Sequence, residues 1–400
     1  MYTILWSMSV ASFGPPEAGN ARYDGCMNTR ASILLTLMLG ACAAAEPDSM
    51  RVSTEGLGDF YAALRSDAEA FGYAEGDWTE DYGDAAAFGP TYYTHVGLSE
   101  EQPDDLARAD EAAQRDLDVV RQGTEDLAWL AANLEEVFMA VQGAITWAGL
   151  TDSSEAIADI DALIDVLDPI VRLAGDYMEV ELGEFASSLY GPTSVTGGVA
   201  VIYLQHAHYL DAERSDEWLA RAAAITDTID SVARDGNHYR FAPEVERLHL
   251  YPNAIMMLVL CRLYEHTGDD DYLRRAEQTF EGIQPLWDER MELYRSPYSE
   301  VSQGAQTDEY STLSSQNYLI MGLMELYKHT GDAAYRDEVV RLLQSIRERL
   351  YSPDDGLIVH HWIDGRPAHE GDKTFFCSGC NLQVLFILWY LESVLDVPLR

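Results

Sequence analysis

The hydrophobic pattern alternates between two kinds of segment in the C-terminal half of the chain. Apolar residues fill nearly every position of "AIMMLVLC" (254–261) and of "YLIMGLMELY" (318–327). The segment after each of them is amphipathic, with apolar residues three or four positions apart, as in Val339, Leu342 and Ile346. A helix that is apolar on all sides must be buried all round. The pattern therefore predicts inner helices that alternate with outer ones.

A repeated phrase joins each inner helix to its outer partner. "YEHTGDDDYL" (264–273) and "YKHTGDAAYR" (327–336) lie 63 positions apart, and both contain Thr-Gly-Asp. Glycine can adopt the left-handed conformation that ends a helix, and aspartate can cap the next helix by accepting its unpaired N–H groups. A weaker copy covers residues 197–229, and another apolar helix begins at Asn381. The sequence therefore predicts a series of helical hairpins.

The connections between hairpins are long. They cover residues 235–251, 286–311 and 351–375, whereas the turns inside the hairpins are short. If the hairpins form a ring, every long connection emerges on one face, which we call the loop face. Long loops on one side of a rigid scaffold are where function usually lies.

The N-terminal half lacks the Thr-Gly-Asp phrase. Residues 105–120, 125–150 and 155–175 have helical periodicity, so we expect them to complete the ring. Residues 73–96, "YAEGDWTEDYGDAAAFGPTYYTHV", are expected to form an aromatic, acidic loop.

The phrase Leu-Tyr-x-His-Thr-Gly-Asp-x-x-Tyr after an apolar helix resembles the hairpins of the six-hairpin, (α/α)6-toroid enzymes. These include N-acylglucosamine 2-epimerase-like proteins, unsaturated glucuronyl hydrolases and several glycosidase families. The resemblance covers about residues 195–395. It implies an all-α (α/α)6 toroid of helical hairpins and a carbohydrate-active protein, without selecting one reaction.

The strong negative charge of the chain disfavours polyanionic ligands. There are 68 acidic and 26 basic residues, a net charge of −42, and the only lysines are Lys328 and Lys373. Such a surface repels phosphate backbones, so we exclude nucleic acid as a partner. A neutral or cationic ligand is favoured over a polyanion.

The segment 27–42, "MNTRASILLTLMLGAC", has the layout of a secretory signal: Arg30 precedes an apolar run that is too short to span a bilayer permanently. Its last four residues resemble a bacterial lipoprotein box, which implies that Cys42 carries lipid. We therefore expect export and a lipid anchor in a bacterial membrane, facing the periplasm or the cell surface.

Four segments follow from this interpretation. Residues 1–26 are expected to be a mis-assigned upstream start, and residues 27–41 the lipoprotein signal peptide. Residues 42–54 would be a linker, and residues 55–400 the helical toroid domain.

Carboxylates near the loop face are candidates for glycoside chemistry. Asp308 and Glu309 stand at the start of an inner helix, where they can be one member of a general acid/base pair or simple helix-capping acids. Glycoside cleavage commonly needs two carboxylates. The second can come from Glu244, Glu246 or Asp364.

A histidine pair lies in "LIVHHWIDG", which reads as a strand followed by a turn at Asp364–Gly365. On a strand, His360 and His361 point to opposite faces, and Trp362 shares the face of His360. His361 is the candidate acid/base, as the epimerase-like relatives imply for loop histidines. A structural histidine is the alternative.

Cys377 and Cys380 form a Cys-x-x-Cys pair with His360, His361 and His369 nearby. In an exported protein we favour a local disulfide at a helix start. Zinc is the next alternative, followed by reduced cysteines or redox chemistry. We therefore expect no metal and no cofactor.

Asn253, Gln316 and Asn381 recur near the starts of inner helices. Together with loop aromatics such as Trp362 they suit sugar hydroxyls and sugar faces, so we assign them, with Glu244 and Glu246, to substrate binding. Helix capping is the alternative for each amide.

The interpretation as a whole is an exported, lipid-anchored toroid that acts on a carbohydrate at its loop face, most simply as a glycoside hydrolase. A sugar epimerase is one alternative. The other is a non-catalytic lipoprotein that binds a glycan or a protein.

The lipoprotein hypothesis makes a direct prediction. The intact mass of protein extracted from membranes should lack residues 1–41 and carry a diacyl adduct at Cys42. A Cys42→Ser variant that is still processed and still membrane-bound would contradict it.

Overall fold

The structure is a computed structural model. It describes residues 52–71, 82–126, 134–151, 153–173, 191–209, 212–242, 248–296, 310–363, 366–367, 369–370, 373–374 and 377–399. The expected signal peptide and Cys42 lie outside these ranges. Among the helices described, none combines the length and the hydropathy that a bilayer crossing needs.

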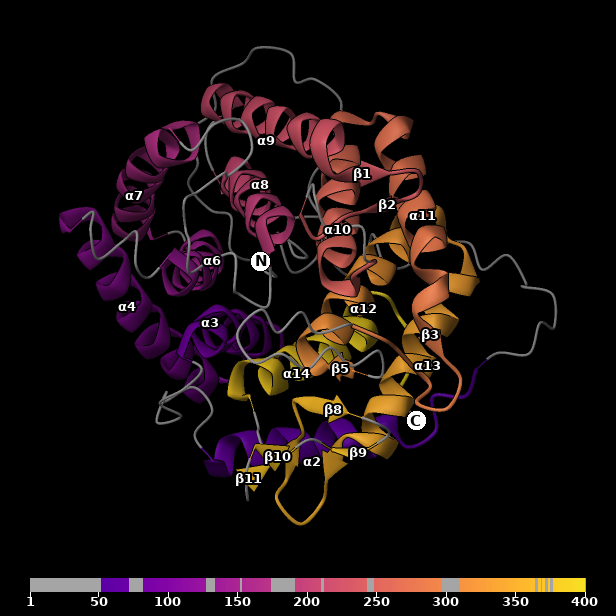
Figure 1. Cartoon of the computed structure of the whole chain (residues 1–400). Helices are drawn as coiled ribbons and strands as arrows, with labels where there is room; N and C mark the ends of the chain where they lie inside the picture. Colours follow the sequence, from indigo (N-terminus) through magenta and orange to yellow (C-terminus); the bar gives the residue numbers. More distant parts are fainter. Residues whose placement is uncertain are drawn as a thin grey trace. The chain divides into compact units, whose positions relative to one another are not determined.

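The inner helices close into a ring (Figure 1). In chain order they are α3 (Tyr82–Ser99), α6 (Leu134–Thr151), α8 (Gly191–Tyr209), α10 (Leu250–Thr267), α12 (Leu313–Thr330) and α14 (Ser378–Ser393). Each packs against the next, and α14 returns to pack against α3. The nearly continuous apolar character of α10, α12 and α14 follows from this position, because their residues are buried over almost the whole helix.

The outer helices complete the hairpins. They are α4 (Pro103–Glu125), α7 (Ser154–Leu173), α9 (Ala212–Ala233), α11 (Asp270–Ile283) and α13 (Ala333–Arg349). Helix α2 (Leu57–Phe71), from the N-terminal end of the toroid, packs against α14 and supplies the last outer partner. The expected (α/α)6 toroid is confirmed, and the helices without the Thr-Gly-Asp phrase take their places in it.

The expected loop at 73–96 is wrong over residues 82–96, which belong to inner helix α3. Small residues and Pro90 conceal the helix in the sequence, because they give no apolar stripe and proline usually breaks a helix. The small residues have a packing role: a Cβ atom at Gly97 would lie 2.7 Å from Cγ of Leu106 on α4. Close approach of α4, together with burial of Tyr92, Tyr93 and Val96, stabilises this helix.

Three hydrogen bonds between neighbouring inner helices join residues that are 63 positions apart, the same spacing as the repeated phrase. They run from Gln205 Nε2 to Gln142 O (3.1 Å), from an Arg262 guanidinium nitrogen to Glu325 Oε1 (2.6 Å), and from Asn317 Nδ2 to Cys380 O (3.0 Å). Of these pairs, Arg262 and Glu325 occupy equivalent positions in the α10 and α12 repeats, because Gly268 and Gly331, which end these helices, are also 63 positions apart.

The Arg262–Glu325 pair is buried, with side-chain exposures of 1% and 0%. Burial alone would raise the pKa of Glu325, but the positive charges of Arg262 and Lys328, with a hydrogen bond from His329, hold that pKa below its usual value. Lys328 also approaches Glu265. Removing one member of such a pair leaves an uncompensated buried charge, so the interface between α10 and α12 depends on both.

The turns inside the hairpins form as the sequence predicts. Gly268 and Gly331 end α10 and α12 with φ of 67° and 68°, in the left-handed region. Asp269 and Asp332 then cap α11 and α13 by accepting backbone N–H groups two residues ahead, at 3.0 and 2.9 Å. The Thr-Gly-Asp phrase is thus a helix stop followed by a helix start.

Each of the three outer-to-inner connections from α9 onward contains a two-stranded antiparallel hairpin near its start. The pairs are β1 (Arg234–Asp235) with β2 (His238–Tyr239), β3 (Trp287–Asp288) with β4 (Leu293–Tyr294), and β6 (Tyr351–Ser352) with β7 (Leu357–Ile358). A 3-10 turn, η4 (Gln284–Leu286), precedes β3. The repeating unit is therefore two helices and one β-hairpin.

The last two connections also form further sheets. β5 (Tyr310–Thr312), β8 (His361–Ile363) and β9 (Arg366–Pro367) make one antiparallel sheet, and β10 (His369–Glu370) pairs with β11 (Lys373–Thr374). The register Ile363↔Arg366 leaves two residues between β8 and β9; the turn expected at Asp364–Gly365 lies outside the described residues.

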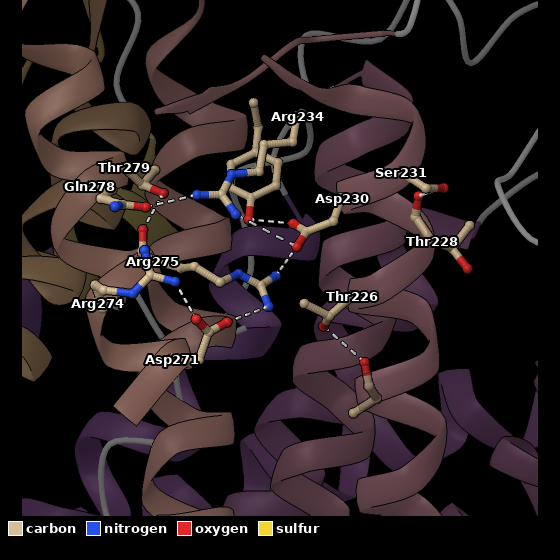
Figure 2. Close-up of polar contacts among 12 residues, drawn as sticks. Thr226, Thr228, Asp230, Ser231, Arg234, Asp271, Arg274, Arg275, Gln278 and Thr279 are labelled. Carbon is tan, nitrogen blue, oxygen red and sulfur yellow. Dashed lines mark hydrogen bonds and ion pairs between the residues drawn. The ribbon is translucent and has the colours of Figure 1, made fainter. Parts of the chain in front are cut away.

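A polar network joins outer helices α9 and α11 to the first β-hairpin (Figure 2). Asp230 forms an ion pair with Arg275 of α11 and accepts a hydrogen bond from the Tyr239 hydroxyl of β2 at 2.6 Å. An Arg234 guanidinium nitrogen donates to Gln278 Oε1 at 2.9 Å. The hairpin is thus fixed to the outer layer on one side.

We predict that Gly331→Val lowers the free energy of unfolding by about 1 kcal/mol or more, because a β-branched residue disfavours a left-handed φ. No atom lies within 4 Å of a Cβ placed at Gly331, so a clash does not contribute. Urea unfolding measures the effect. Gly331→Asn, which tolerates this conformation better, is the control and should lose less; equal stability of all three proteins would contradict the prediction.

Candidate functional site

Three amide side chains at equivalent places hold the β-hairpins against the inner helices at the loop face. Asn253, Gln316 and Asn381 are each the fourth residue of their helix, α10, α12 and α14. We call these three residues the amide clamps, because each one binds both the N–H and the C=O of a single strand residue.

The contacts repeat closely. Asn253 Oδ1 accepts from the N–H of Tyr239 at 2.7 Å, while Nδ2 donates to the carbonyl of Tyr239 at 2.9 Å. Gln316 does the same with Tyr294, at 3.3 and 2.6 Å. Asn381 does the same with Ile358.

For Asn381 the two distances to Ile358 are 2.8 and 3.2 Å. Each clamp also has a third contact near its own helix start. Asn253 donates to the carbonyl of His249 and Asn381 to that of Cys377, both at 2.7 Å. Gln316 donates to Ser311 Oγ at 2.8 Å.

These contacts correct the assignment of the three amides to sugar binding. All three are fully buried, and both donor and acceptor groups are used by the backbone. Helix capping describes only their third contact. Their main role is to satisfy the inward-facing polar groups of a strand that would otherwise be buried without partners.

The segment with the two histidines bends instead of forming one strand. β7 ends at Ile358, Val359 still donates to Leu350 O at 2.8 Å, and β8 begins at His361. The chain changes sheets at His360, whose carbonyl accepts from the N–H of Leu313 at 2.8 Å. His360 and Trp362 are both buried, at 5% and 8% exposure.

The pairing of β5 with β8 brings two long connections together. Thr312 lies opposite His361, and Tyr310 lies opposite Ile363. β5 starts one residue after Glu309, so the backbone that follows Asp308 and Glu309 runs beside the strand of His361. The side chains of His361 and His369, and residues Asp308, Glu309, Glu244, Glu246 and Asp364, lie outside what the structure describes; their catalytic roles stay predictions.

The first turns of the inner helices meet at this rim. The rings of Tyr251 and Tyr318 are 4.6 Å apart in an edge contact between α10 and α12. Phe241 packs on His249 at 4.7 Å, just before α10. At the start of α12, Ser315 exchanges hydrogen bonds with Thr312 and Ser296. These aromatic and hydroxyl groups are buried beside the strand pair.

Cys377 and Cys380 carry separate thiols, so the structure does not form the disulfide that the sequence favours. Cys377 is the N-cap of α14, and its Sγ accepts from the N–H of Cys380 at 3.0 Å. The imidazole that comes close is that of His360. One ligand atom from each of these three residues lies within 4.8 Å of the other two.

Sequence reasoning thus missed two features of this rim. It considered the amides for the substrate although their recurrence in three repeats is a sign of a structural role. It also did not foresee the bend between β7 and β8 at His360, where this imidazole lies close to the cysteine pair.

Comparison with known proteins identifies one matching family model and several solved structures of similar fold. Residues 194–379 match the family model "Glycosyl hydrolase family 76". No protein of curated function matches the sequence significantly.

Several solved structures share the fold. A cellobiose 2-epimerase from Bacillus thermoamylovorans is 12% identical, with a TM-score of 0.61 over 84% of this chain and 100% of that chain. A family 76 α-mannanase from Bacteroides thetaiotaomicron is 12% identical, with a TM-score of 0.56 over 86% and 98%. An unsaturated glucuronyl hydrolase from Bacillus sp. GL1 is 13% identical, with a TM-score of 0.55 over 85% and 96%. These structures confirm the six-hairpin, (α/α)6-toroid fold that the sequence resembles.

We predict that Asn253→Leu lowers the free energy of unfolding by more than about 2 kcal/mol, because the N–H and C=O of Tyr239 would be left buried without partners. Urea unfolding measures the loss. Met257→Leu, one turn further along the buried face of α10, is the control and should cost less than about 1.5 kcal/mol. A similar loss in both variants would show that the clamp adds little beyond packing.

Proposed function

We propose that this toroid is a glycoside hydrolase that acts on a neutral, mannose-containing glycan at its loop face. The observation that carries the proposal is the match to glycosyl hydrolase family 76 over residues 194–379. That stretch runs from α8 to the start of α14 and contains all three clamped β-hairpins and the sheet of β5, β8 and β9.

The architecture supports a site at the loop face. The inner helices all begin on this face, because each is joined to the next through an outer helix that runs back. Helix N-termini favour negative charge, so the rim can stabilise carboxylates and the oxygen atoms of a reacting glycoside. The rigid inner ring and the clamps give the loops a fixed base.

The reaction we assign to the loops needs two carboxylates. We propose Asp308 as the general acid, assisted by Glu309 and by His361 from the adjacent strand. The pairing of β5 with β8 supports this, since it places the two connections side by side.

The charge of the chain supports the choice of substrate. A net charge of −42 disfavours polyanionic glycans such as those built from uronic acids. Neutral mannans carry no such penalty, and the family 76 structures include an α-mannanase. The acidic surface therefore favours the mannanase-like reaction over the glucuronyl hydrolase-like one.

We also propose that the enzyme works outside the cytoplasm, tethered through lipid on Cys42. The motive is the signal layout at 27–42 with its terminal Leu-Gly-Ala-Cys. A tethered enzyme at the cell envelope meets polymeric glycans more readily than free metabolic sugars.

Asp308→Asn tests the proposal. Thr312, not Asp308, is the N-cap of α12, so the melting temperature should hold, while release of reducing sugar from α-mannan should fall at least about a hundredfold. The matched control is Asp270→Asn, an exposed acid at the start of α11 on the opposite face, which should keep full activity.

Other outcomes would redirect the assignment. Full activity of Asp308→Asn would remove Asp308 as the acid. If the wild type instead interconverts mannose-type and glucose-type sugars without cleaving glycosidic bonds, the epimerase reading replaces hydrolysis. If it neither cleaves nor converts any glycan but binds one, the toroid is a scaffold.

A further inference from the structure

Two thiols and one imidazole, side chains that commonly bind transition metals, converge where α14 meets the loop face. Cys377, Cys380 and His360 are buried, with exposures of 0%, 1% and 5%. One atom from each lies within 4.8 Å of the other two. In tetrahedral zinc sites, bonds of about 2.3 Å to sulfur set ligand atoms roughly 3.8 Å apart. An ion therefore needs only a small contraction of this cluster.

The backbone around the three ligands is already fixed. The clamp Asn381 binds Ile358, two residues before His360, and also the carbonyl of Cys377. His360 itself is held through its carbonyl by the N–H of Leu313. One amide side chain thus sets the distance between the histidine and the cysteine pair, which is the preorganisation that a metal site requires.

The neighbouring repeat provides an internal comparison. At the start of α12 the positions equivalent to Cys377 and Cys380 are Thr312 and Ser315, and Thr312 Oγ1 accepts from the N–H of Ser315 at 3.1 Å. Oxygen side chains therefore make the same cap without sulfur, and they are the preferred residues for it. Capping explains one acceptor at the first position, but not two thiols with an imidazole beside them.

We propose that His360, Cys377 and Cys380 bind a zinc ion. Two thiolates and one neutral imidazole match the preference of Zn²⁺ for sulfur and nitrogen ligands and neutralise its charge in a buried place. The N–H of Cys380 that donates to Cys377 Sγ and the positive end of α14 both favour ligand sulfur as thiolate. Three protein ligands leave a fourth tetrahedral position for a water molecule or another donor.

A second group of possible metal ligands differs from His360, Cys377 and Cys380 because positively charged side chains lie beside it. Glu265, Glu325 and His329 also lie close together. There, however, Arg262 and Lys328 already supply positive charge, at 2.6 Å and 3.4 Å from Glu325 oxygens. A divalent cation would be repelled by those side chains, so that group serves as an ion-pair network.

Zinc at His360, Cys377 and Cys380 would join the bend between β7 and β8 to the start of α14. The last long connection would then be fixed at both ends, by the Asn381 clamp and by the metal. This proposal does not rest on the glycosidase assignment, and its test needs no substrate.

The test compares the full chain, purified under reducing conditions, with the double variant Cys377→Thr, Cys380→Ser, which copies the cap of α12. Co²⁺ added to chelator-treated wild type should bind at one equivalent and give the near-ultraviolet thiolate-to-cobalt band and the visible bands of a tetrahedral site. The double variant, which keeps Cys26, Cys42 and Cys261, should give neither. A chelator should lower the melting temperature of the wild type only.

His360→Gln is the second variant, and it keeps the proposal falsifiable if the double variant does not fold. It should weaken Co²⁺ binding and change the visible bands, because it removes the nitrogen ligand. Absence of cobalt bands in reduced wild type would overturn the proposal, as would the same bands in the double variant. So would a thiol count on protein isolated without reductant that falls short by two and is restored by reduction, because Cys377 and Cys380 would then form a disulfide.

Discussion

A side-chain amide that binds both polar groups of one strand residue is the interaction on which the loop face depends. At Asn253, Gln316 and Asn381 this contact fixes the first β-hairpin of a connection to the helix that the connection leads into. The strand groups involved are buried, so no water can replace the amide at low cost. The residues that follow the hairpin in each connection therefore start from a backbone position that is fixed by the inner helix.

The sequence predicts the ring well because the ring is made by periodic burial. Alternation of wholly apolar and amphipathic segments and the Thr-Gly-Asp turn identify the hairpins of α10 to α13 directly, and both turns form as expected. Helix α3 escapes the same reasoning since its buried face is built from small residues and tyrosines around Pro90. Its stability comes from close packing with α4, which a pattern along one chain segment cannot reveal.

The candidate site is harder to predict for a related reason. In a repeat protein, a polar residue that recurs at the same position of each repeat usually has a structural role in that repeat, as the amide clamps do. A residue that differs from its equivalents in the other repeats has a role specific to its own position. Cys377 and Cys380 stand where the preceding unit has Thr312 and Ser315, and Arg262 meets Glu325 although the two positions are equivalent. Comparing units with one another therefore separates architecture from chemistry better than judging each residue alone.

The closing contacts of the ring bear on how the chain folds during synthesis. Helix α14 lies at the C-terminal end, yet it packs against α2 and α3, which are synthesised first. Until α14 is available, the apolar sides of α2 and α3 that face it have no partner. Contacts of such large sequence separation slow folding and prolong the exposure of apolar surface. A truncation that removes only α14 would leave the whole ring open.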